Sequence, residues 1–212
     1  MLKSDFVAKS SIEKRIEKVS FSNLENVDLY LVNLKDIQEA EVENAKELLS
    51  QEEIDQCERY RAQDKRESAL ITQEALRHLI GNGAILRDSY GKPYLDGNPF
   101  YFNVSHTQDY AFIGISQTPI GVDIEKILEE RVIPNTPLMS ESEHQVIKNA
   151  PDKADAFFSF WCAKEALLKA RGTGFQTRSV PTLVPDSGIF HSDDDQIHVV
   201  TRGEVKLAVC CR

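Results

Sequence analysis

The chain alternates between short apolar-rich stretches, typical of β-strands, and longer stretches in which apolar residues recur at helical spacing. Four central strands are predicted, over residues 27–34, 100–105, 110–116 and 120–125. The last two are separated by a turn at residues 117–119, which contains Pro119. The tail has the pattern of a β-hairpin, formed by residues 196–200 and 205–211.

Two long helices are predicted, one before and one after the central strands. The first covers residues 66–80 and ends at Gly81 or Gly83; its recurring positions are Ala69, Thr72, Gln73, Leu76, Leu79 and Ile80. The second covers residues 153–171 and ends at Gly172 or Gly174; its buried stripe is Phe160, Ala163, Leu167 and Ala170. Shorter helices begin within residues 48–53, where Ser50 and Glu53 have capping-box spacing, and near Ser140.

Each half of the chain therefore has a long helix followed by antiparallel strands. This order predicts an α+β fold of two pseudo-duplicated halves, each with a long helix packed on a small antiparallel sheet. The boundary is expected near residues 116–120, which gives an N-terminal half over residues 27–117 and a C-terminal half over residues 118–212. Residues 1–26 are polar and charged, and we interpret them as an N-terminal extension without a predicted element.

The bulk composition of the 212 residues is that of a soluble globular protein, with 41% hydrophobic and 28% charged residues. Apolar runs fall short of the roughly 18 residues that span a bilayer, and the amino terminus lacks the apolar block of a secretory signal. The net charge of −9 argues against nucleic-acid and membrane binding. The four cysteines lack metal or disulfide spacing, which predicts reduced thiols in the cytoplasm.

A segment of alternating residues at 121–126 is the first candidate for chemistry. As a strand it would direct Val122 and Ile124 into a core, with Asp123 and Glu125 together on the other face. Exposed strand edges commonly bear acidic residues, so this alternative stays open for the segment taken alone.

The helical segment at residues 161–169 is the second candidate. Glu165 and Lys169 are four residues apart and share a helix face, with Lys164 set to one side. Together with the strand carboxylates they would provide three acidic groups and two ammonium groups, a set that fits a hard cation with a polyphosphate ligand. A solvated helix face with Lys–Glu pairs is the alternative interpretation.

Two shorter segments add donors for phosphate oxygens. Ser105 and His106 end the strand that begins near Phe100, and because strand neighbours point to opposite faces, the pair argues against a hydrolase triad. A surface or satisfied core histidine is the alternative for His106. Lys92 follows Gly91 in a turn where it could reach a ligand, although the flanking pattern of a P-loop is absent.

A basic group precedes and begins the first long helix. In isolation it is most simply a solvated helix face, and phosphate binding by one or two members is the alternative. The group consists of Arg59, Arg61, Lys65, Arg66 and Arg77.

The order of these segments resembles the signature of the 4′-phosphopantetheinyl transferases, in particular the surfactin-type branch. The four segments are Tyr-Gly-Lys-Pro at 90–93, Phe-Asn-Val-Ser-His at 102–106, Gly-Val-Asp-Ile-Glu-Lys at 121–126 and Trp-x-x-Lys-Glu-x-x-x-Lys at 161–169. The resemblance extends from about residue 27 to residue 211. The length is similar to the monomeric, two-half type with internal pseudo-twofold symmetry, and unlike the shorter trimer-forming type.

The resemblance implies an enzyme that transfers the 4′-phosphopantetheine arm of coenzyme A to a serine of an apo acyl, polyketide or peptidyl carrier protein. The reaction would depend on Mg²⁺ and release adenosine 3′,5′-bisphosphate. The implied magnesium ligands are Asp123, Glu125 and Glu165. Glu165 would accept the serine proton, directly or through a water, and Lys169 would stabilise the departing phosphate. A non-catalytic CoA- or carrier-binding protein of the same fold is the rival hypothesis.

The resemblance also implies a set of residues that contact coenzyme A. Ala69 stands where a hydroxyl that helps to hold the 3′-phosphate is expected, so the basic residues nearby are candidates for that role. The implied coenzyme A contacts are Lys92, Ser105, His106, Lys164, Lys169, Arg59 and Arg66.

Overall fold

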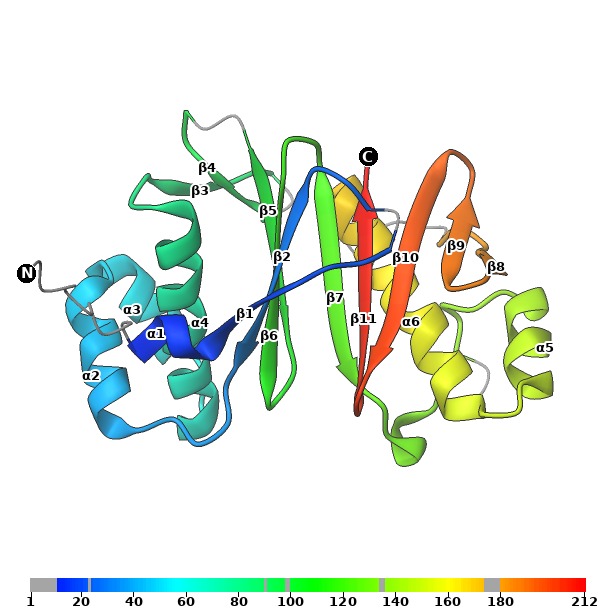
Figure 1. Cartoon of the computed structure of the whole chain (residues 1–212), viewed down its shortest axis with the longest axis horizontal. Coiled ribbons are helices and arrows are strands. Elements are labelled where there is room, and N and C mark those ends of the chain that lie inside the picture. Colours follow the sequence, from blue (N-terminus) through cyan, green and yellow to red (C-terminus); the bar gives the residue numbers. More distant parts are fainter. Residues whose placement is uncertain (1–10, 23, 90, 98–99, 134–135, 174–179) are drawn as a thin grey trace, which may run out of the picture.

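Two antiparallel sheets lie face to face, and helices cover the outer side of each sheet (Figure 1). The computed structural model describes residues 11–22, 24–89, 91–97, 100–133, 136–173 and 180–212. The predicted Tyr90 and Gly174 lie outside the described residues. Every strand pairing in the described part is antiparallel, so the predicted α+β class is confirmed.

The first sheet is built from the part of the chain that precedes residue 117. Its strand order is β1 (Ile16–Val19), β2 (Val27–Asn33), β6 (Tyr110–Ser116) and β5 (Tyr101–His106). A separate two-stranded ribbon joins β3 (Ile85–Arg87) to β4 (Pro93–Leu95). The helices of this part are α1 (Ser11–Arg15), α2 (Glu39–Leu48), α3 (Gln51–Glu58) and α4 (Gln63–Ile80).

The second sheet is built from the part of the chain that follows residue 119. Its strand order is β7 (Ile120–Lys126), β11 (Val205–Cys211), β10 (Asp195–Arg202), β9 (Ile189–Ser192) and β8 (Val184–Asp186). The helices are the short η1 (Glu129–Arg131), α5 (Glu141–Asn149) and α6 (Lys153–Arg171). The bounds predicted for β6 and α6 are confirmed. The division into two duplicated halves stays a prediction.

Strand alternation divides the core into three clusters. Between the sheets lie Leu31 and Phe112 from the first sheet and Val122, Ile124 and Leu207 from the second. Buried side chains of α4 pack on the outer face of the first sheet, and those of α6 pack on the outer face of the second. The predicted inward direction of Val122 and Ile124 is confirmed, and the opposite face of β7 is directed at α6.

The buried face of α4 differs from the one expected from its spacing. Four of the positions expected at helical spacing are only partly buried: Ala69, Thr72, Gln73 and Leu79. Helices α2 and α3 also pack against α4, so the buried face of α4 is not the one that faces the sheet alone. Glu74 is 4% exposed and accepts a hydrogen bond from Asn44 of α2 at 2.9 Å. The buried residues of α4 are Leu70, Ile71, Glu74, Ala75, Leu76 and Ile80.

The extension expected over residues 1–26 is corrected for its described part. Residues 11–19 form α1 and the edge strand β1, which pairs with β2. Ile12 is buried, and Phe21 packs between the sheets against Phe112. These few apolar residues are widely spaced along a charged stretch, which hides the pattern from a reading of the sequence.

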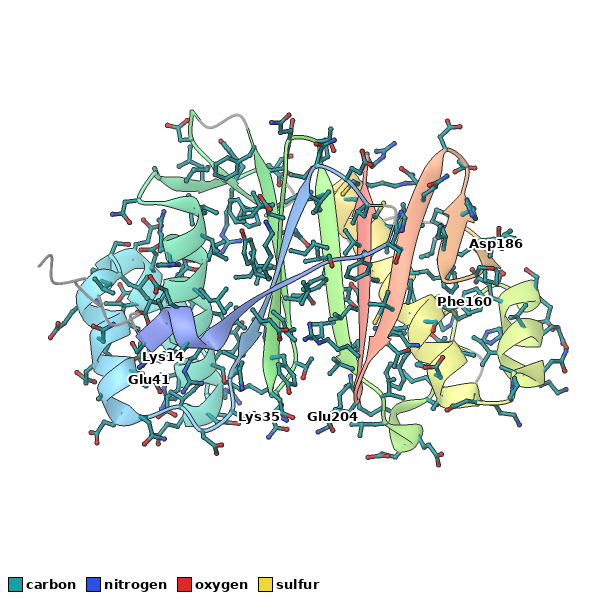
Figure 2. The ribbon with its side chains drawn as sticks, in the orientation of Figure 1. Lys14, Lys35, Glu41, Phe160, Asp186 and Glu204 are labelled. Atoms are coloured by element: carbon teal, nitrogen blue, oxygen red, sulfur yellow. The ribbon has the colours of Figure 1, made fainter. Side chains whose placement is uncertain are left out.

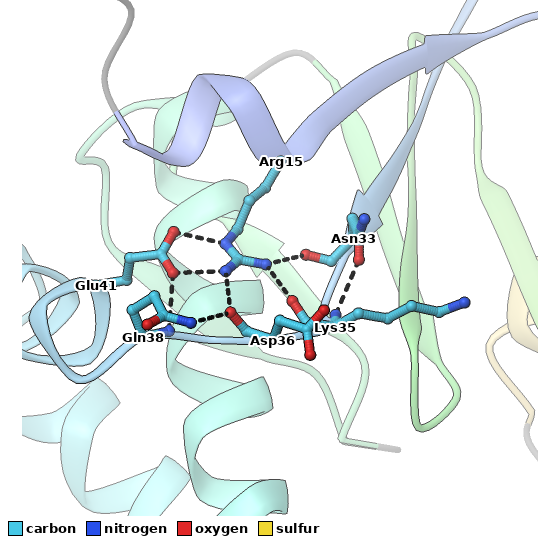
Figure 3. Close-up of polar contacts among 6 residues, drawn as sticks. All are labelled: Arg15, Asn33, Lys35, Asp36, Gln38 and Glu41. Atoms are coloured by element: carbon cyan, nitrogen blue, oxygen red, sulfur yellow. Dashed lines mark hydrogen bonds and ion pairs between the residues drawn. The ribbon is translucent and has the colours of Figure 1, made fainter.

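Arg15 attaches this segment to the rest of the first half (Figure 3). Its guanidinium donates to both carboxylate oxygens of Glu41, at 2.7 and 2.5 Å. It also donates to the backbone carbonyls of Asn33, Lys35 and Asp36, at 2.9, 2.9 and 3.2 Å. The side chain thereby ties α1 to the start of α2 and to the loop after β2.

Replacement of Arg15 by alanine is expected to lower the free energy of unfolding by about 2–4 kcal/mol, because it leaves a half-buried carboxylate and several carbonyls without their donor. Urea denaturation measures the loss. The exposed neighbour Lys14 is the matched control, and Lys14→Ala should change stability by less than about 0.5 kcal/mol. Equal losses in the two variants would contradict the role given to Arg15.

Ion pairs also join the two parts of the chain along one edge. Lys35 and Glu204, both labelled at the lower edge of Figure 2, lie 3.5 Å apart across the gap between the sheets. Lys126 bridges Glu204 and Asp109, each at 3.2 Å. These contacts help to hold β7 in place beside the first sheet. Among the described residues, none of the helices combines the length and the apolar character needed to cross a membrane.

Candidate functional site

The candidate site lies where β5 of the first sheet meets β7 of the second. The side-chain carbonyl of buried Asn103 accepts the backbone N–H of Val122 at 2.9 Å, which attaches one strand to the other. Two residues further along β5, and one further along β7, Ser105 Oγ donates to Asp123 Oδ1 at 2.7 Å. The sequence separation of 18 residues between Ser105 and Asp123 is thus closed by a buried hydrogen bond.

Helix α6 brings Lys169 to the same point. Its Nζ donates to Asp123 Oδ1 at 2.7 Å, to Ser105 Oγ at 2.9 Å and to the carbonyl of Val122 at 3.2 Å. The helix can approach so closely because Gly121 has no side chain: a Cβ there would lie 2.0 Å from the carbonyl oxygen of Ala166. The glycine before Val122 is therefore required by packing against the helix.

Glu165 and Glu125 place further negative charge around Asp123. Burial, followed by the charge of Asp123, raises the pKa of Glu165 to about 7, and Lys169 only partly opposes the effect. Burial and Asp123 also raise the pKa of Glu125, opposed by Arg131. Arg131 forms an ion pair with Glu125 at 3.0 Å. The three carboxylates thus influence one another's pKa in one partly desolvated region.

The fit of these residues to a divalent cation is mixed. Asp123 Oδ2 is buried without a hydrogen-bond partner. A hard cation would give this oxygen a ligand and would offset the repulsion that raises the pKa of Glu165. Yet the described residues hold no group of three His, Cys, Asp or Glu side chains arranged to bind a metal ion. The ligand set of Asp123, Glu125 and Glu165 therefore stays a prediction, and Oε2 of Glu125 is engaged by Arg131 in this structure.

Lys92 and His106 lie at the edges of the site. The Lys92 ammonium donates to the carbonyls of Ile120 and Lys169, at 3.1 and 2.7 Å, and burial lowers the pKa of Lys92. Desolvation, followed by the charges of Lys169 and Lys65, lowers the pKa of His106. The His106 side chain keeps contact with solvent, so it can meet a ligand.

Lys164 is not part of this site, contrary to the expectation. Its side chain is 2% exposed and forms a buried ion pair with Glu143 of α5 at 2.9 Å. It also donates to the carbonyl of Pro181 at 2.6 Å. Adjacent residues on a helix point in different directions, so Glu165 reaches the site while Lys164 reaches α5.

Replacement of Lys164 by methionine is expected to lower the free energy of unfolding by roughly 3–5 kcal/mol, because it leaves the buried Glu143 carboxylate without its cation. Coenzyme A affinity of the folded protein, measured by calorimetry at low temperature, should stay within about twofold of the unchanged chain. A large loss of coenzyme A affinity in the folded variant would show that Lys164 contributes to coenzyme A binding.

The basic group at the start of α4 is only partly available. Arg66 donates to the carbonyls of Tyr60 and Arg61, at 3.1 and 2.8 Å, and lies 3.5 Å from Glu58. Arg59 is exposed at the end of α3. Lys65, which the sequence assigned to a solvated face, is close enough to His106 to lower its pKa. Its position in the first turn of α4 was the signal that could have found it.

The chain is similar in sequence to a family model and to several known proteins. A family model described as the 4′-phosphopantetheinyl transferase superfamily matches residues 119–209. The chain is 30% identical over 173 residues to the 4′-phosphopantetheinyl transferase HetI of Nostoc sp., with 71% of this chain and 70% of that protein covered. It is 32% identical over 90 residues to 4′-phosphopantetheinyl transferase gsp of Aneurinibacillus migulanus, with 42% and 38% covered. It is 29% identical over 145 residues to psf-1 of Bacillus pumilus, with 63% and 62% covered. The matches thus span 38% and 62% of the lengths of gsp and psf-1.

Proposed function

Because this chain belongs to the 4′-phosphopantetheinyl transferase superfamily, we propose that it transfers the phosphopantetheine arm of coenzyme A to a serine of an apo carrier protein. The arm would leave with one phosphate of the coenzyme A pyrophosphate, and adenosine 3′,5′-bisphosphate would be released. The observation that supports this best is a carboxylate of raised pKa, Glu165, beside the ion pair of Lys169 and Asp123.

Glu165 is the proposed proton acceptor. The serine hydroxyl must lose its proton as its oxygen bonds to phosphorus, and a carboxylate beside the site can accept it. The pKa of Glu165 is raised to about 7 in the metal-free chain, and a bound cation would lower it, which favours transfer through a water. The proton would pass to a Glu165 oxygen, directly or through a water. The phosphorus–oxygen bond to the adenosine bisphosphate breaks in the same displacement, and its electron pair goes to the departing phosphate.

Lys169 is the proposed stabiliser of that departing phosphate. Its ammonium is held in the site by three oxygen acceptors, and it would exchange one of these hydrogen bonds to donate to the departing phosphate. Asp123 and Glu165 would hold Mg²⁺ when it is bound, and the cation would neutralise charge on the pyrophosphate and orient it for attack. Asp123 Oδ2, which is buried without a hydrogen-bond partner, supports this assignment.

The remaining coenzyme A phosphate contacts are proposed from the polar and cationic side chains around the site, of which Ser105 and Lys92 would exchange present hydrogen bonds for the ligand. His106 and Ser105 lie at the end of β5, and Lys92 lies beside the carbonyl of Lys169. Lys65 is added because its charge reaches His106. Arg59 stays a candidate for the 3′-phosphate, whereas Arg66 would first have to leave two backbone carbonyls.

The oligomeric state, the two-half organisation and the carrier partners are also proposals. The chain is proposed to act as a cytoplasmic monomer with two halves, residues 27–117 and 118–212. Acyl, polyketide and peptidyl carriers are all compatible partners. With a net charge of −9, an acidic carrier would have to dock on a local basic or apolar surface.

The test is incubation of the protein with coenzyme A, Mg²⁺ and an apo carrier protein, followed by mass spectrometry of the carrier. The proposal predicts a gain of one phosphopantetheine arm, lost when a chelator is added or when the carrier serine is replaced by alanine. Binding of coenzyme A without any mass gain across carriers of all three types would instead support the rival, non-catalytic function.

A further inference from the structure

Glu125 is held by an arginine for which the proposed reaction has no use. Arg131 Nη1 lies 3.0 Å from Glu125 Oε2, and the two side chains are 49% and 19% exposed. Glu125 is on the face of β7 that bears Asp123, so its carboxylate would otherwise be available to the same cation. Arg131 therefore competes with a cation for the Glu125 carboxylate.

The turn that follows β7 brings Arg131 back beside Glu125 of that strand. The chain turns through η1, where the N–H of Arg131 donates to the carbonyl of Leu128 at 3.0 Å. On its other side the guanidinium carbon lies 5.9 Å from the ring centroid of Phe158, a buried residue of α6. The guanidinium thus contacts both a carboxylate of the site and an aromatic ring of the core.

The three carboxylates are consequently not equivalent. Asp123 is paired with Lys169, and Glu125 is paired with Arg131. Within the described part of the chain, Glu165 takes part in no ion pair, and the only buried side-chain oxygen without a hydrogen bond is Asp123 Oδ2. Each carboxylate of the site thus has a different set of partners in the described part of the chain.

We infer that Arg131 is a positioning residue that withholds Glu125 from the divalent cation, so that the cation is held by Asp123 and Glu165 alone. The inference rests on the proposed function, since it concerns the same cation. A site with two protein carboxylates leaves more coordination positions for pyrophosphate oxygens and waters, as is usual for Mg²⁺. Arg131 would therefore make cation binding weak until coenzyme A arrives.

The test is the affinity of the whole protein for Mn²⁺, an oxygen-seeking probe for the Mg²⁺ site, measured by electron paramagnetic resonance without coenzyme A or carrier. Arg131→Gln should bind Mn²⁺ about three- to tenfold more tightly, because Glu125 is released to the ion. Glu125→Gln alone should stay within about twofold of the unchanged chain, and the double variant should lose the gain. Arg202→Gln is the control, since Arg202 is also half-exposed and paired, with Glu17, away from the site.

Three results would overturn the inference: unchanged Mn²⁺ affinity in Arg131→Gln, a gain that persists in the double variant, or an affinity loss of about tenfold or more in Glu125→Gln alone. Carrier modification is measured in parallel on the same preparations. Normal transfer by the unchanged chain with any of these results would overturn the role of Arg131 only. Absence of transfer by the unchanged chain would overturn the proposed function itself.

Discussion

Glu165→Gln is expected to lower the rate of carrier modification by about 10²- to 10⁴-fold, because glutamine cannot accept the serine proton. Coenzyme A should still bind, since the phosphate donors Lys92, His106 and Lys65 are untouched. Single-turnover rates and calorimetric affinities measure the two effects separately. The exposed Glu52 of α3 offers a matched control, and Glu52→Gln should leave both quantities unchanged. Retained turnover in Glu165→Gln would remove this residue from its role.

The raised pKa of Glu165 makes a second expectation for the same variant. The pKa of this carboxyl is about 7 in the folded chain, compared with its ordinary value of 4.5, which applies to the unfolded chain. The folded chain therefore binds the proton more tightly. The folded state therefore binds more protons between these pH values, so this group lowers stability as pH rises from about 4.5 to about 7. Urea denaturation without metal should show Glu165→Gln gaining stability relative to the unchanged chain over this range. Parallel stability curves would contradict the electrostatic account.

Lys169→Met is expected to have the second large effect, with transfer slowed by about 10²- to 10³-fold. The change removes the cation that meets Asp123, Ser105 and the carbonyl of Val122. It should also cost roughly 3–5 kcal/mol of unfolding free energy, because the Asp123 side chain is only 5% exposed.

Lys164→Met is the control for this second variant, since it removes an ammonium from the same helix and breaks a buried ion pair of its own. Both variants should lose stability, but only Lys169→Met should lose turnover. Transfer at low temperature, where both remain folded, separates the two. Equal rates in the two variants would mean that Lys169 has a structural role only.

Features that depend on neighbouring residues in the sequence were predicted, and features that depend on residues far apart in the sequence were not. Helix α6 and strand β6 were predicted with their observed bounds, because their patterns are local and end at glycine or at a turn. Alternation placed Val122 and Ile124 on one face of β7 and Asp123 and Glu125 on the other. That this second face meets α6, where Lys169 lies 2.7 Å from Asp123, depends on the packing of distant segments, which periodicity does not give.

The errors arose from partners that no local pattern reveals. The resemblance implied Lys164 as a coenzyme A contact, but its partner Glu143 is on a different helix. The resemblance also implied Glu125 as a magnesium ligand, and its ion pair with Arg131 depends on the turn at η1. Residues 11–19 lacked a visible pattern because their place is fixed by Arg15 and by contacts with distant strands.

The proposed activity requires that Asp123 and Glu165 bind the same divalent ion. Crystals grown with coenzyme A and Mn²⁺, examined by anomalous scattering at the manganese edge, would locate that ion. We expect one manganese peak bonded to oxygens of both carboxylates and to the coenzyme A pyrophosphate. A manganese ion bound elsewhere, with the pyrophosphate remote from Asp123 and Glu165, would contradict the proposed site.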